Sequence, residues 1–283
     1  MLACLTALLL GVCPGGTWSQ LDAGDYFTCG VKSDGELCCF GSNNQSKATP
    51  PAGVYAQVSA GQAHACAVTT AGAVACWGSN EDNKATPPTT GTYTFVVAAM
   101  NHSCALSSTD NSITCWGRDS VAYQEASPPN GRFNLLAGGY QHTCARSIAD
   151  SRPWCWGSSE GGRLTGYPAQ TVTALAPGLY NTCVILTGGT VFCWGESLVQ
   201  AASPGSTFPL SDAISNGAAH GCAIAVGGTV SCWGYRGATP TAIAQPGGTF
   251  TAITVGQDHS CGIVAAGTVS CWGGNAQGQA TPP

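Results

Sequence analysis

Residues 58–80 read VSAGQAHACAVTTAGAVACWGSN, and residues 85–88 follow as ATPP. Short apolar runs broken by glycine are typical of β-strands, and no helical periodicity is present. This part of the chain therefore predicts three strands, at Tyr55 to Ala60, His64 to Thr69 and Ala73 to Trp77. The polar residues after Gly78 end on a proline pair, which predicts at most a short, irregular outer strand at a sheet edge, because proline donates no ladder hydrogen bond.

The same unit recurs along the whole chain of 283 residues. The tripeptide Cys-Trp-Gly occurs six times, Cys39-Phe40-Gly41 is a seventh, degenerate copy, and another cysteine precedes each tripeptide by ten or eleven residues. A period near 39 with short apolar runs predicts propeller blades or a solenoid. We expect an apolar N-terminal segment at 1–16, followed by one domain at 17–283 whose repeats cover about 17–54, 55–92, 93–132, 133–170, 171–207, 208–249 and 250–283.

The spacing of the cysteines fixes the register of the hairpin made by the second and third strands. If Cys66 faces Cys76, Val68 faces Val74 and a three-residue loop ends at Gly72, a position that favours glycine. Opposed residues of this kind are close enough for a disulfide. Free thiols and zinc are the alternatives, and neither requires facing cysteines in every unit. The predicted disulfides are Cys29 with Cys39, Cys66 with Cys76, Cys104 with Cys115, Cys144 with Cys155, Cys183 with Cys193, Cys222 with Cys232 and Cys261 with Cys271.

Three cysteines are left over, at positions 4, 13 and 38, and their pairing stays open. The apolar run from Leu2 to Cys13 is too short to span a bilayer. It resembles the apolar region of a secretory signal, although no basic residue precedes it. The alternative is a docked N-terminal strand that helps to close the ring. The seven predicted disulfides indicate an oxidising compartment, so we expect a secreted or cell-surface protein without a transmembrane segment.

The repeat, with its HxC and CWG motifs and its closing ATPP, resembles that of the regulator of chromosome condensation family. This resemblance covers residues 17–283 and implies an all-β fold, a closed seven-bladed β-propeller. The paired cysteines are more similar to the secreted and cell-surface branch, which includes the ectodomains of crinkly-type plant receptor kinases; the β-lactamase inhibitor protein II is a relative in fold. The chain lacks an insertion between its even repeats and a basic tail, so exchange on a small GTPase is not expected.

Charge and residue phase exclude several function classes. Only 8% of the residues are charged, the net charge is −5 and the nine basic residues are scattered, which excludes nucleic-acid binding through a basic patch. All five histidines occupy one repeat phase, at positions 64, 102, 142, 220 and 259, with Phe27 and Asn181 in the other two units. Residues spread around a ring in this way cannot converge as a metal site or a catalytic triad. We therefore expect no catalytic residues, no metal and no cofactor, and a packing or hydrogen-bonding role for the histidines.

Two weaker signals concern carbohydrate. The tryptophans of the Cys-Trp-Gly motifs are expected to lie in the core between blades, although stacking against sugars is an alternative. Asn44-Gln-Ser46 and Asn101-His-Ser103 are N-glycosylation acceptor sequences, which predicts modification of Asn44 and Asn101 in a eukaryotic secretory route.

The function predicted from the sequence is a non-catalytic extracellular module that recognises a protein partner through the loops at one end of the propeller. The two residues before each histidine position vary while their neighbours repeat, which is typical of recognition loops. Tyrosine is enriched at interface hot spots. The hypothesised contact set is Asp25, Tyr26, Tyr140, Tyr180 and Asp258. The alternatives are a carbohydrate-binding lectin and a structural repeat of a surface coat or filament.

Overall fold

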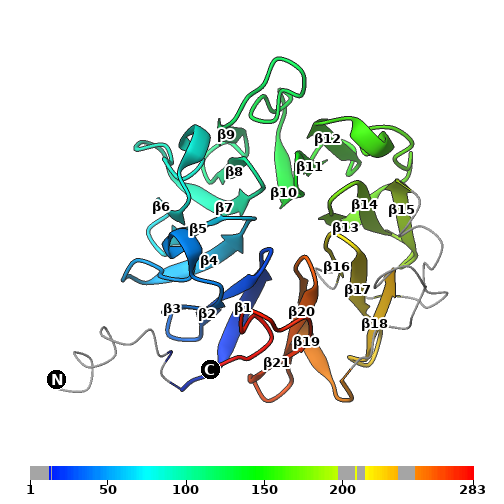
Figure 1. Ribbon diagram of the computed structural model, residues 1–283. Coiled ribbons are helices and arrows are strands. Elements are labelled where there is room, and N and C mark those ends of the chain that lie inside the picture. The colour runs from blue at the N-terminus through cyan, green and yellow to red at the C-terminus, as the bar shows by residue number, and fades with distance from the viewer. Residues whose placement is uncertain (1–12, 14, 197–207, 209–213, 235–245) are drawn as a thin grey trace.

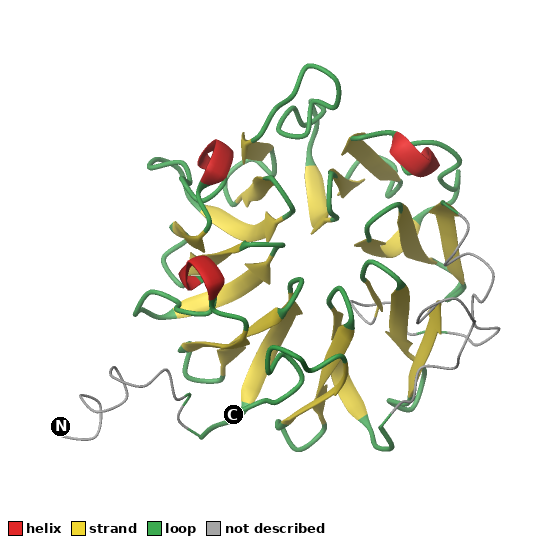
Figure 2. Cartoon of the chain, viewed as in Figure 1, coloured by secondary structure: helices red, strands yellow, loops and turns green. Residues whose placement is uncertain are grey.

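The computed structural model describes residues 13, 15–196, 208, 214–234 and 246–283. The N-terminal segment predicted at 1–16 lies almost wholly outside these residues, as do Cys4 and the repeat boundary expected at residue 207. Within the described ranges the fold is all-β, with seven three-stranded antiparallel sheets arranged around a common axis (Figure 1). Figure 2 shows how little helix accompanies them.

Each sheet, here called a blade, contains three consecutive strands, the first nearest the axis (Figure 1). The blades are β1 (Trp18–Ala23), β2 (Phe27–Lys32) and β3 (Leu37–Gly41); β4 (Tyr55–Ala60), β5 (His64–Thr69) and β6 (Val74–Gly78); β7 (Tyr93–Ala98), β8 (His102–Ser107) and β9 (Ile113–Gly117); β10 (Phe133–Gly138), β11 (His142–Ser147) and β12 (Pro153–Gly157); β13 (Val172–Pro177), β14 (Asn181–Leu186) and β15 (Val191–Gly195); β16 (Ile214–Asn216), β17 (His220–Ile224) and β18 (Val230–Gly234); β19 (Phe250–Val255), β20 (His259–Val264) and β21 (Val269–Gly273).

The hairpin register predicted from cysteine spacing is confirmed. Cys66 faces Cys76 and Val68 faces Val74, and Gly72 takes a positive φ of 87° at the end of the loop. In the two blades with eleven-residue spacing, the same left-handed position falls on Asn111 and Ser151. Asparagine tolerates this conformation better than most residues. All seven predicted disulfides are present, with Cα atoms 4.0 to 4.1 Å apart.

An eighth disulfide joins two of the three cysteines that the spacing left unassigned. Cys13 pairs with Cys38, with 5.6 Å between their Cα atoms. Cys38 lies next to Cys39 on β3, and alternate residues of a strand point to opposite faces. The chain just before the first blade is therefore held against the outer strand of that blade.

The expected irregular outer strand is absent from the described residues. In three blades the segment after the third strand forms a short 3₁₀ turn instead: η2 (Asn44–Ser46), η3 (Glu81–Asn83) and η4 (Glu160–Gly162). Asparagine side chains satisfy the backbone there, since Asn43 Oδ1 accepts from the Ala48 amide and Asn80 Oδ1 accepts from the Ala85 amide, each at 2.9 Å. Local bonds of this kind compete with a sheet ladder, so a fourth strand was the wrong expectation for these segments.

The apolar core lies between blades. Phe27 and Val31 of the first blade pack with Tyr55 and Val58 of the second, and comparable clusters fill the other junctions. The first and last blades touch in the same way, because Leu21 and Phe40 pack with Cys261 and Ile263. Backbone and side-chain bonds accompany this contact: the Trp18 amide donates to Gly267 O at 2.9 Å, and the Ala23 amide donates to Thr254 Oγ1 at 2.8 Å.

A column of small residues sets the distance between blades near the axis. It consists of the residue directly after each first strand: Gly24, Gly61, Ala99, Gly139, Gly178, Gly217 and Gly256. A Cβ on each of the six glycines would lie closer than 3.0 Å to the carbonyl oxygen of the column residue in the following blade. The last of these contacts runs from Gly256 to Gly24 O. Blades can approach this closely only where a side chain is absent.

We predict that peptide mapping without reduction recovers the seven local links together with Cys13 linked to Cys38. Replacing both Cys66 and Cys76 by serine opens a ring of about ten residues, and should lower the free energy of unfolding by about 2 to 3 kcal/mol on the chain-entropy model. Denaturant titration of the double variant measures this loss. Free thiols at most of the paired positions in native material would contradict the predicted covalent structure.

Candidate binding end of the blades

Two sets of loops meet at one end of the molecule. The turns between first and second strands contain the variable residue pairs singled out from the sequence. The segments that leave the third strands bond directly to these turns: the Ser42 amide donates to Tyr26 O, and the Ser79 amide donates to Ala63 O, each at 2.8 Å. The same bond recurs between Glu196 and Tyr180 O and between Gly274 and Asp258 O. We call this surface the loop end.

The structure divides the five hypothesised contact residues into two groups. Tyr26 is 38% exposed and Tyr180 is 41% exposed, and the Asp258 side chain is 40% exposed. These three face outward. Asp25 is only 6% exposed, and the Tyr140 hydroxyl donates to Asp25 Oδ1 at 2.5 Å.

The Tyr140–Asp25 bond crosses the axis, because Tyr140 belongs to the fourth blade and Asp25 to the first. Burial raises the pKa of Asp25, while the hydrogen bond from Tyr140 opposes that rise. Burial and the adjacent Asp25 carboxylate also raise the pKa of Tyr140. The pair therefore spans the inner mouth of the loop end, whereas Tyr26, Tyr180 and Asp258 stand around it.

Both exposed tyrosines rest on buried cations that the sequence reasoning missed. Lys47 Nζ lies 5.9 Å from the ring centroid of Tyr26 and 5.0 Å from that of Phe27. The Arg163 guanidinium lies 4.9 Å from the ring centroid of Tyr180. Contacts at this range are cation–π interactions, in which the cation attracts the face of the ring. A repeat signal was available, because Lys47, Lys84 and Arg163 each follow the second cysteine of their unit by eight residues.

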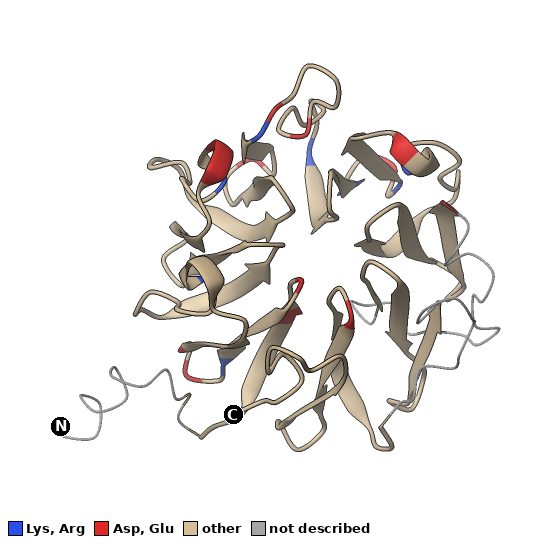
Figure 3. Ribbon diagram, viewed as in Figure 1, with Lys and Arg blue, Asp and Glu red and all other residues tan. Residues whose placement is uncertain are grey.

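The loop end is acidic at its surface because its cations are mostly buried. Lys47, Lys84 and Arg163 are 6%, 2% and 0% exposed. Arg118 is the exception among the described residues, with a side chain that is 40% exposed and 3.6 Å from Glu125. The exposed acids lie on the loops that leave the third strands and in the last blade: Glu81, Asp82, Asp119, Glu160, Glu196 and the partly exposed Asp258. In Figure 3 the ribbon is red, the colour of Asp and Glu, near the axis in the first and last blades.

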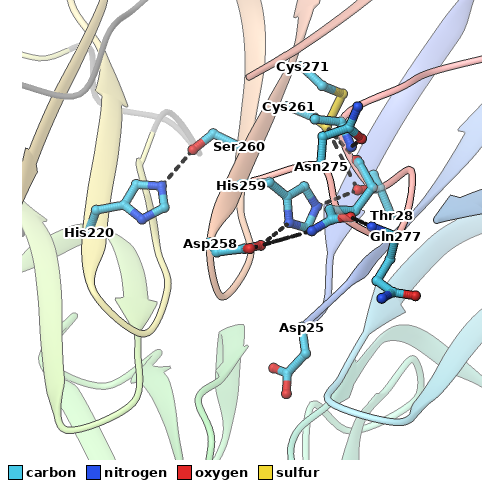
Figure 4. A network of polar contacts seen from close by, with 12 residues as sticks. Asp25, Thr28, His220, Asp258, His259, Ser260, Cys261, Cys271, Asn275 and Gln277 are labelled. Carbon is cyan, nitrogen blue, oxygen red and sulfur yellow. Dashed lines mark hydrogen bonds and ion pairs between the residues drawn. A yellow bond between two sulfur atoms is a disulfide. The ribbon is translucent and has the colours of Figure 1, made fainter. Parts of the chain in front are cut away.

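The histidines join neighbouring blades. In five junctions a histidine Nε2 lies 2.7 or 2.8 Å from a serine or threonine hydroxyl of the next blade. The pairs are His64 with Ser103, His102 with Thr143, His142 with Thr182, His220 with Ser260 and His259 with Thr28. Figure 4 shows the last two pairs side by side. Ser103 Oγ donates to Lys84 O, so it accepts from His64. The predicted hydrogen-bonding role is confirmed for these five residues.

In the two blades without histidine, the hydroxyl residue of the following blade is also missing, so the histidine–hydroxyl pairs could have been recognised in the sequence. Phe27 replaces histidine in the first blade, and Ala65 then replaces the hydroxyl residue in the second. Asn181 replaces histidine in the fifth blade, and Gly221 replaces the hydroxyl residue in the sixth. Asn181 Oδ1 instead accepts from Asn216 Nδ2 at 2.8 Å. A comparison of these two repeat columns would have predicted the bonds.

One of these pairs has the order of a catalytic triad. Asp258 Oδ1 lies 3.6 Å from His259 Nδ1, and His259 Nε2 lies 2.8 Å from Thr28 Oγ1 (Figure 4). Both His259 and Thr28 are fully buried, so no substrate reaches the hydroxyl. Burial lowers the pKa of His259 to about 4, which keeps the ring neutral. Four other junctions contain the same histidine–hydroxyl pair with no acid in the Asp258 position, which makes a structural role the better explanation.

The motif tryptophans also connect blades. The indole Nε1 of Trp77 donates to Lys47 O, that of Trp156 to Glu125 O and that of Trp194 to Arg163 O, at 2.9 to 3.1 Å. Each of these side chains is at most 9% exposed. The predicted core position is confirmed for them, and they offer no face for a sugar.

Of the two predicted glycosylation sites, Asn44 is exposed in η2, while Asn101 is half-buried and its acceptor residue Ser103 is fully buried.

Three segments, residues 18–46, 55–83 and 250–279, match the family model described as the regulator of chromosome condensation (RCC1) repeat. The three segments fall in the first, second and last blades, and the first blade contacts both of the others. Each matched segment begins at the first strand of its blade and includes all three strands. No curated protein sequence matches the chain.

Several solved structures superpose on most of the chain. The ectodomain of the receptor kinase CR4 from Physcomitrella patens is 25% identical with a TM-score of 0.76, over 92% of this chain and 74% of that one. The CRINKLY WD40 ectodomain of the receptor kinase ACR4 from Arabidopsis thaliana is 24% identical with the same TM-score, over 92% and 96%. Prp20p from Saccharomyces cerevisiae is 16% identical with a TM-score of 0.67, over 92% and 83%.

The similar receptor ectodomains and the eight disulfides of the described residues favour an extracellular location for this chain. In the part of the chain that the structure describes, no helix is long and apolar enough to cross a membrane. Over the same residues, no three His, Cys, Asp or Glu side chains gather as a metal site.

We predict that the His64–Ser103 bond shows coupling in a double-mutant cycle. Ser103→Ala leaves a buried imidazole nitrogen unpaired, which should cost about 1 to 3 kcal/mol. His64→Phe with Ser103→Ala copies the natural Phe27 and Ala65 junction, and should be less destabilised than the sum of the single variants. Denaturant titration of the four proteins measures the coupling. Strict additivity would contradict a direct bond.

We also predict that stability falls in mild acid. Burial lowers the pKa of His64 and His142 to about 3, and that of His102 and His259 to about 4. These histidines stay neutral in the folded chain but protonate near 6.5 when it unfolds, so the unfolded state binds more protons and the free energy of unfolding drops from about pH 6.5 toward pH 4. Burial raises the pKa of Asp22 to about 6 and also raises the pKa of Asp25. These two carboxyl groups stabilise the folded chain in acid, but they are outnumbered by the four histidines.

Denaturant titration at pH 7 and pH 4.5 measures this loss. The variant with His64→Phe and Ser103→Ala should lose less stability between the two pH values than the wild-type chain. Equal stability of the wild-type chain at both values would contradict neutral buried histidines.

Proposed function

We propose that the chain is a closed seven-bladed propeller that acts outside the cell as a non-catalytic module and binds a protein partner at the loop end. The proposal rests on the contrast between the repeated residues of the blades and the variable residues that stand around the mouth of the loop end, here called the rim: Tyr26, Tyr180 and Asp258. Glycine, histidine and cysteine repeat from blade to blade, whereas the position just before the histidine varies: it holds tyrosine at Tyr26 and Tyr180, aspartate at Asp258, and alanine, asparagine or glutamine in the other blades. Tyr26, Tyr180 and Asp258 stand exposed. Variable residues on a rigid scaffold are the usual form of a recognition surface.

Closure of the ring is supported by bonds at every junction near the axis. Side chains link the inner strands from the sixth blade through the first to the third, for example Ser215 Oγ to the Val255 amide and Ser59 Oγ to the Ala98 amide. Backbone bonds link the remaining loops, such as the Tyr140 amide to Gly178 O. A ring leaves no inner sheet edge for pairing with other chains.

The supported tyrosines suit a contact role. Tyrosine supplies a large contact area for little entropy cost, and buried Lys47 and Arg163 lie against the rings of Tyr26 and Tyr180. Asp25 and Tyr140, the other members of the contact set, form the floor between them. The acidic surface of the loop end favours a partner with exposed lysine and arginine, since complementary charge steers association.

The proposed location, secreted or attached to a cell surface, agrees with the ectodomain relatives. Glycosylation at Asn44 fits this location because Asn44 lies in an exposed 3₁₀ turn. A glycan on Asn101 would lie at the loop end itself, next to the bond from the Met100 amide to Tyr140 O. Occupied Asn101 would therefore narrow the surface left for a partner.

We predict that Tyr26→Ala and Tyr180→Ala each weaken partner binding by at least about 1 kcal/mol. The partner is first captured from native extracellular material on the immobilised chain and identified by mass spectrometry, and its affinity is then measured by calorimetry. Ile148→Ala is the matched control, because Ile148 is 44% exposed in the loop between β11 and β12, away from the loop end. If the double tyrosine variant keeps full affinity while folded, the binding surface lies elsewhere.

A further inference from the structure

A cavity of about 250 Å³ lies on the axis of the ring. The first strands of all seven blades line it, and it reaches the turns of the loop end, where the Tyr140–Asp25 bond crosses its mouth. Figure 1 shows the first strands facing one another around this axis. At about 30 Å³ for each water-sized group, the cavity has room for about eight such groups.

The wall of the cavity is polar on one side and apolar on the other. Gln20 and Asp22 of the first blade line it together with Thr254 of the seventh, while Phe95 of the third blade and Leu135 of the fourth line it on the far side. Phe95 and Leu135 are only half-buried. A ligand that fits both sides has a polar group at one end and a hydrocarbon part at the other.

Asp22 links the first blade to the second by a hydrogen bond that does not require a charged side chain. Its Oδ2 accepts from the Ala60 amide of the next blade at 2.9 Å. Hydroxyls make the same link elsewhere in this repeat position: Ser59 Oγ accepts from the Ala98 amide at 3.0 Å, and Ser215 Oγ accepts from the Val255 amide at 2.9 Å. A serine in place of Asp22 would therefore join the first two blades without a charge.

The Asp22 carboxylate has no cation of the described residues paired with it. Its Oδ1 accepts from Thr254 Oγ1 at 3.2 Å, and burial raises its pKa to about 6 because the surroundings stabilise the anion too weakly. An enclosed carboxylate without a countercharge is costly. Asp22 is half-buried at the cavity wall, and Asp25, at the mouth of the same cavity, adds a carboxylate that is buried.

We propose that the axial cavity binds an ammonium or guanidinium group on a short apolar stem, with the cation toward Asp22 and Asp25 and the stem against Phe95 and Leu135. Two sources carry this chemistry: a lysine or arginine side chain of the protein partner, and a free alkylamine. Only the first source rests on the proposed function. Tyr26 and Tyr180 do not line the cavity, so the rim and the cavity can be tested separately.

Calorimetric titration of the full chain with pentylammonium tests the site, with 1-pentanol and pentanoate as probes of the same stem. Pentylammonium should bind at least about tenfold more tightly than 1-pentanol, a difference of about 1.4 kcal/mol, and pentanoate should not bind. Equal affinity for pentylammonium and 1-pentanol would overturn the proposal, since the carboxylates would then contribute nothing.

The variant Asp22→Ser removes the charge and keeps the type of link that Ser59 makes. It should lose at least about tenfold in affinity for pentylammonium and leave affinity for 1-pentanol unchanged. Asp34→Ser is the matched control, because Asp34 is exposed in the loop between β2 and β3, away from the cavity. Unchanged pentylammonium affinity in folded Asp22→Ser, checked by thermal unfolding, would also overturn the proposal.

Competition distinguishes the two sources once the site is established. If pentylammonium displaces the captured protein partner, and Asp22→Ser weakens that partner as well, a lysine or arginine side chain of the partner is the natural occupant. If pentylammonium binds in the presence of the partner without displacing it, the occupant is a free amine. Both outcomes support the cavity site, and neither depends on the tyrosine variants of the rim.

Discussion

The structure depends on how closely the inner strands of neighbouring blades can approach. Six of the seven column positions near the axis are glycine, and each faces the carbonyl oxygen of the next blade across a gap that a Cβ would close. This approach brings hydroxyls within reach of the histidines and lets side chains such as Asp22 and Ser59 bond the backbone of the next blade. The high glycine content, 39 of 283 residues, thus has a geometric cause.

Blades of three short strands bury little surface by themselves, and the disulfides compensate for this. Each one closes the hairpin of the second and third strands, with the first cysteine fully buried between blades, as Cys66 and Cys183 are. Small sheets of this kind are marginal without packing on both faces. Packing between blades then supplies most of the core, and the outer 3₁₀ turns bring Lys47 and Lys84 beneath the loops of the following blade.

Much of the fold followed from the sequence because it is periodic. Facing cysteines, Gly72 in its loop and the three strands of each unit depend on local spacing, which every copy repeats. The Tyr140–Asp25 bond was not predictable, because it joins residues 115 positions apart that occur once each. The disulfide between Cys13 and Cys38 was not predicted either, because neither cysteine recurs in the other units. The outer segments were misjudged because Asn43 and Asn80 bond their own loops instead of leaving the backbone for a ladder.

In every histidine bond the imidazole belongs to one blade and the hydroxyl to the following blade. A unit can therefore contribute a histidine toward the next blade and a hydroxyl toward the previous one. Three units have both a histidine and a hydroxyl residue: those with His102-Ser103, His142-Thr143 and His259-Ser260. A tandem copy of one of them could bond the previous blade through its hydroxyl and the following blade through its histidine. A copy of the unit with His64-Ala65 would leave its neighbour's buried imidazole without a hydroxyl. Gene duplication in such a ring is therefore expected to extend it through the first kind of unit, and the Phe27 and Asn181 units fit only ahead of neighbours that lack the hydroxyl.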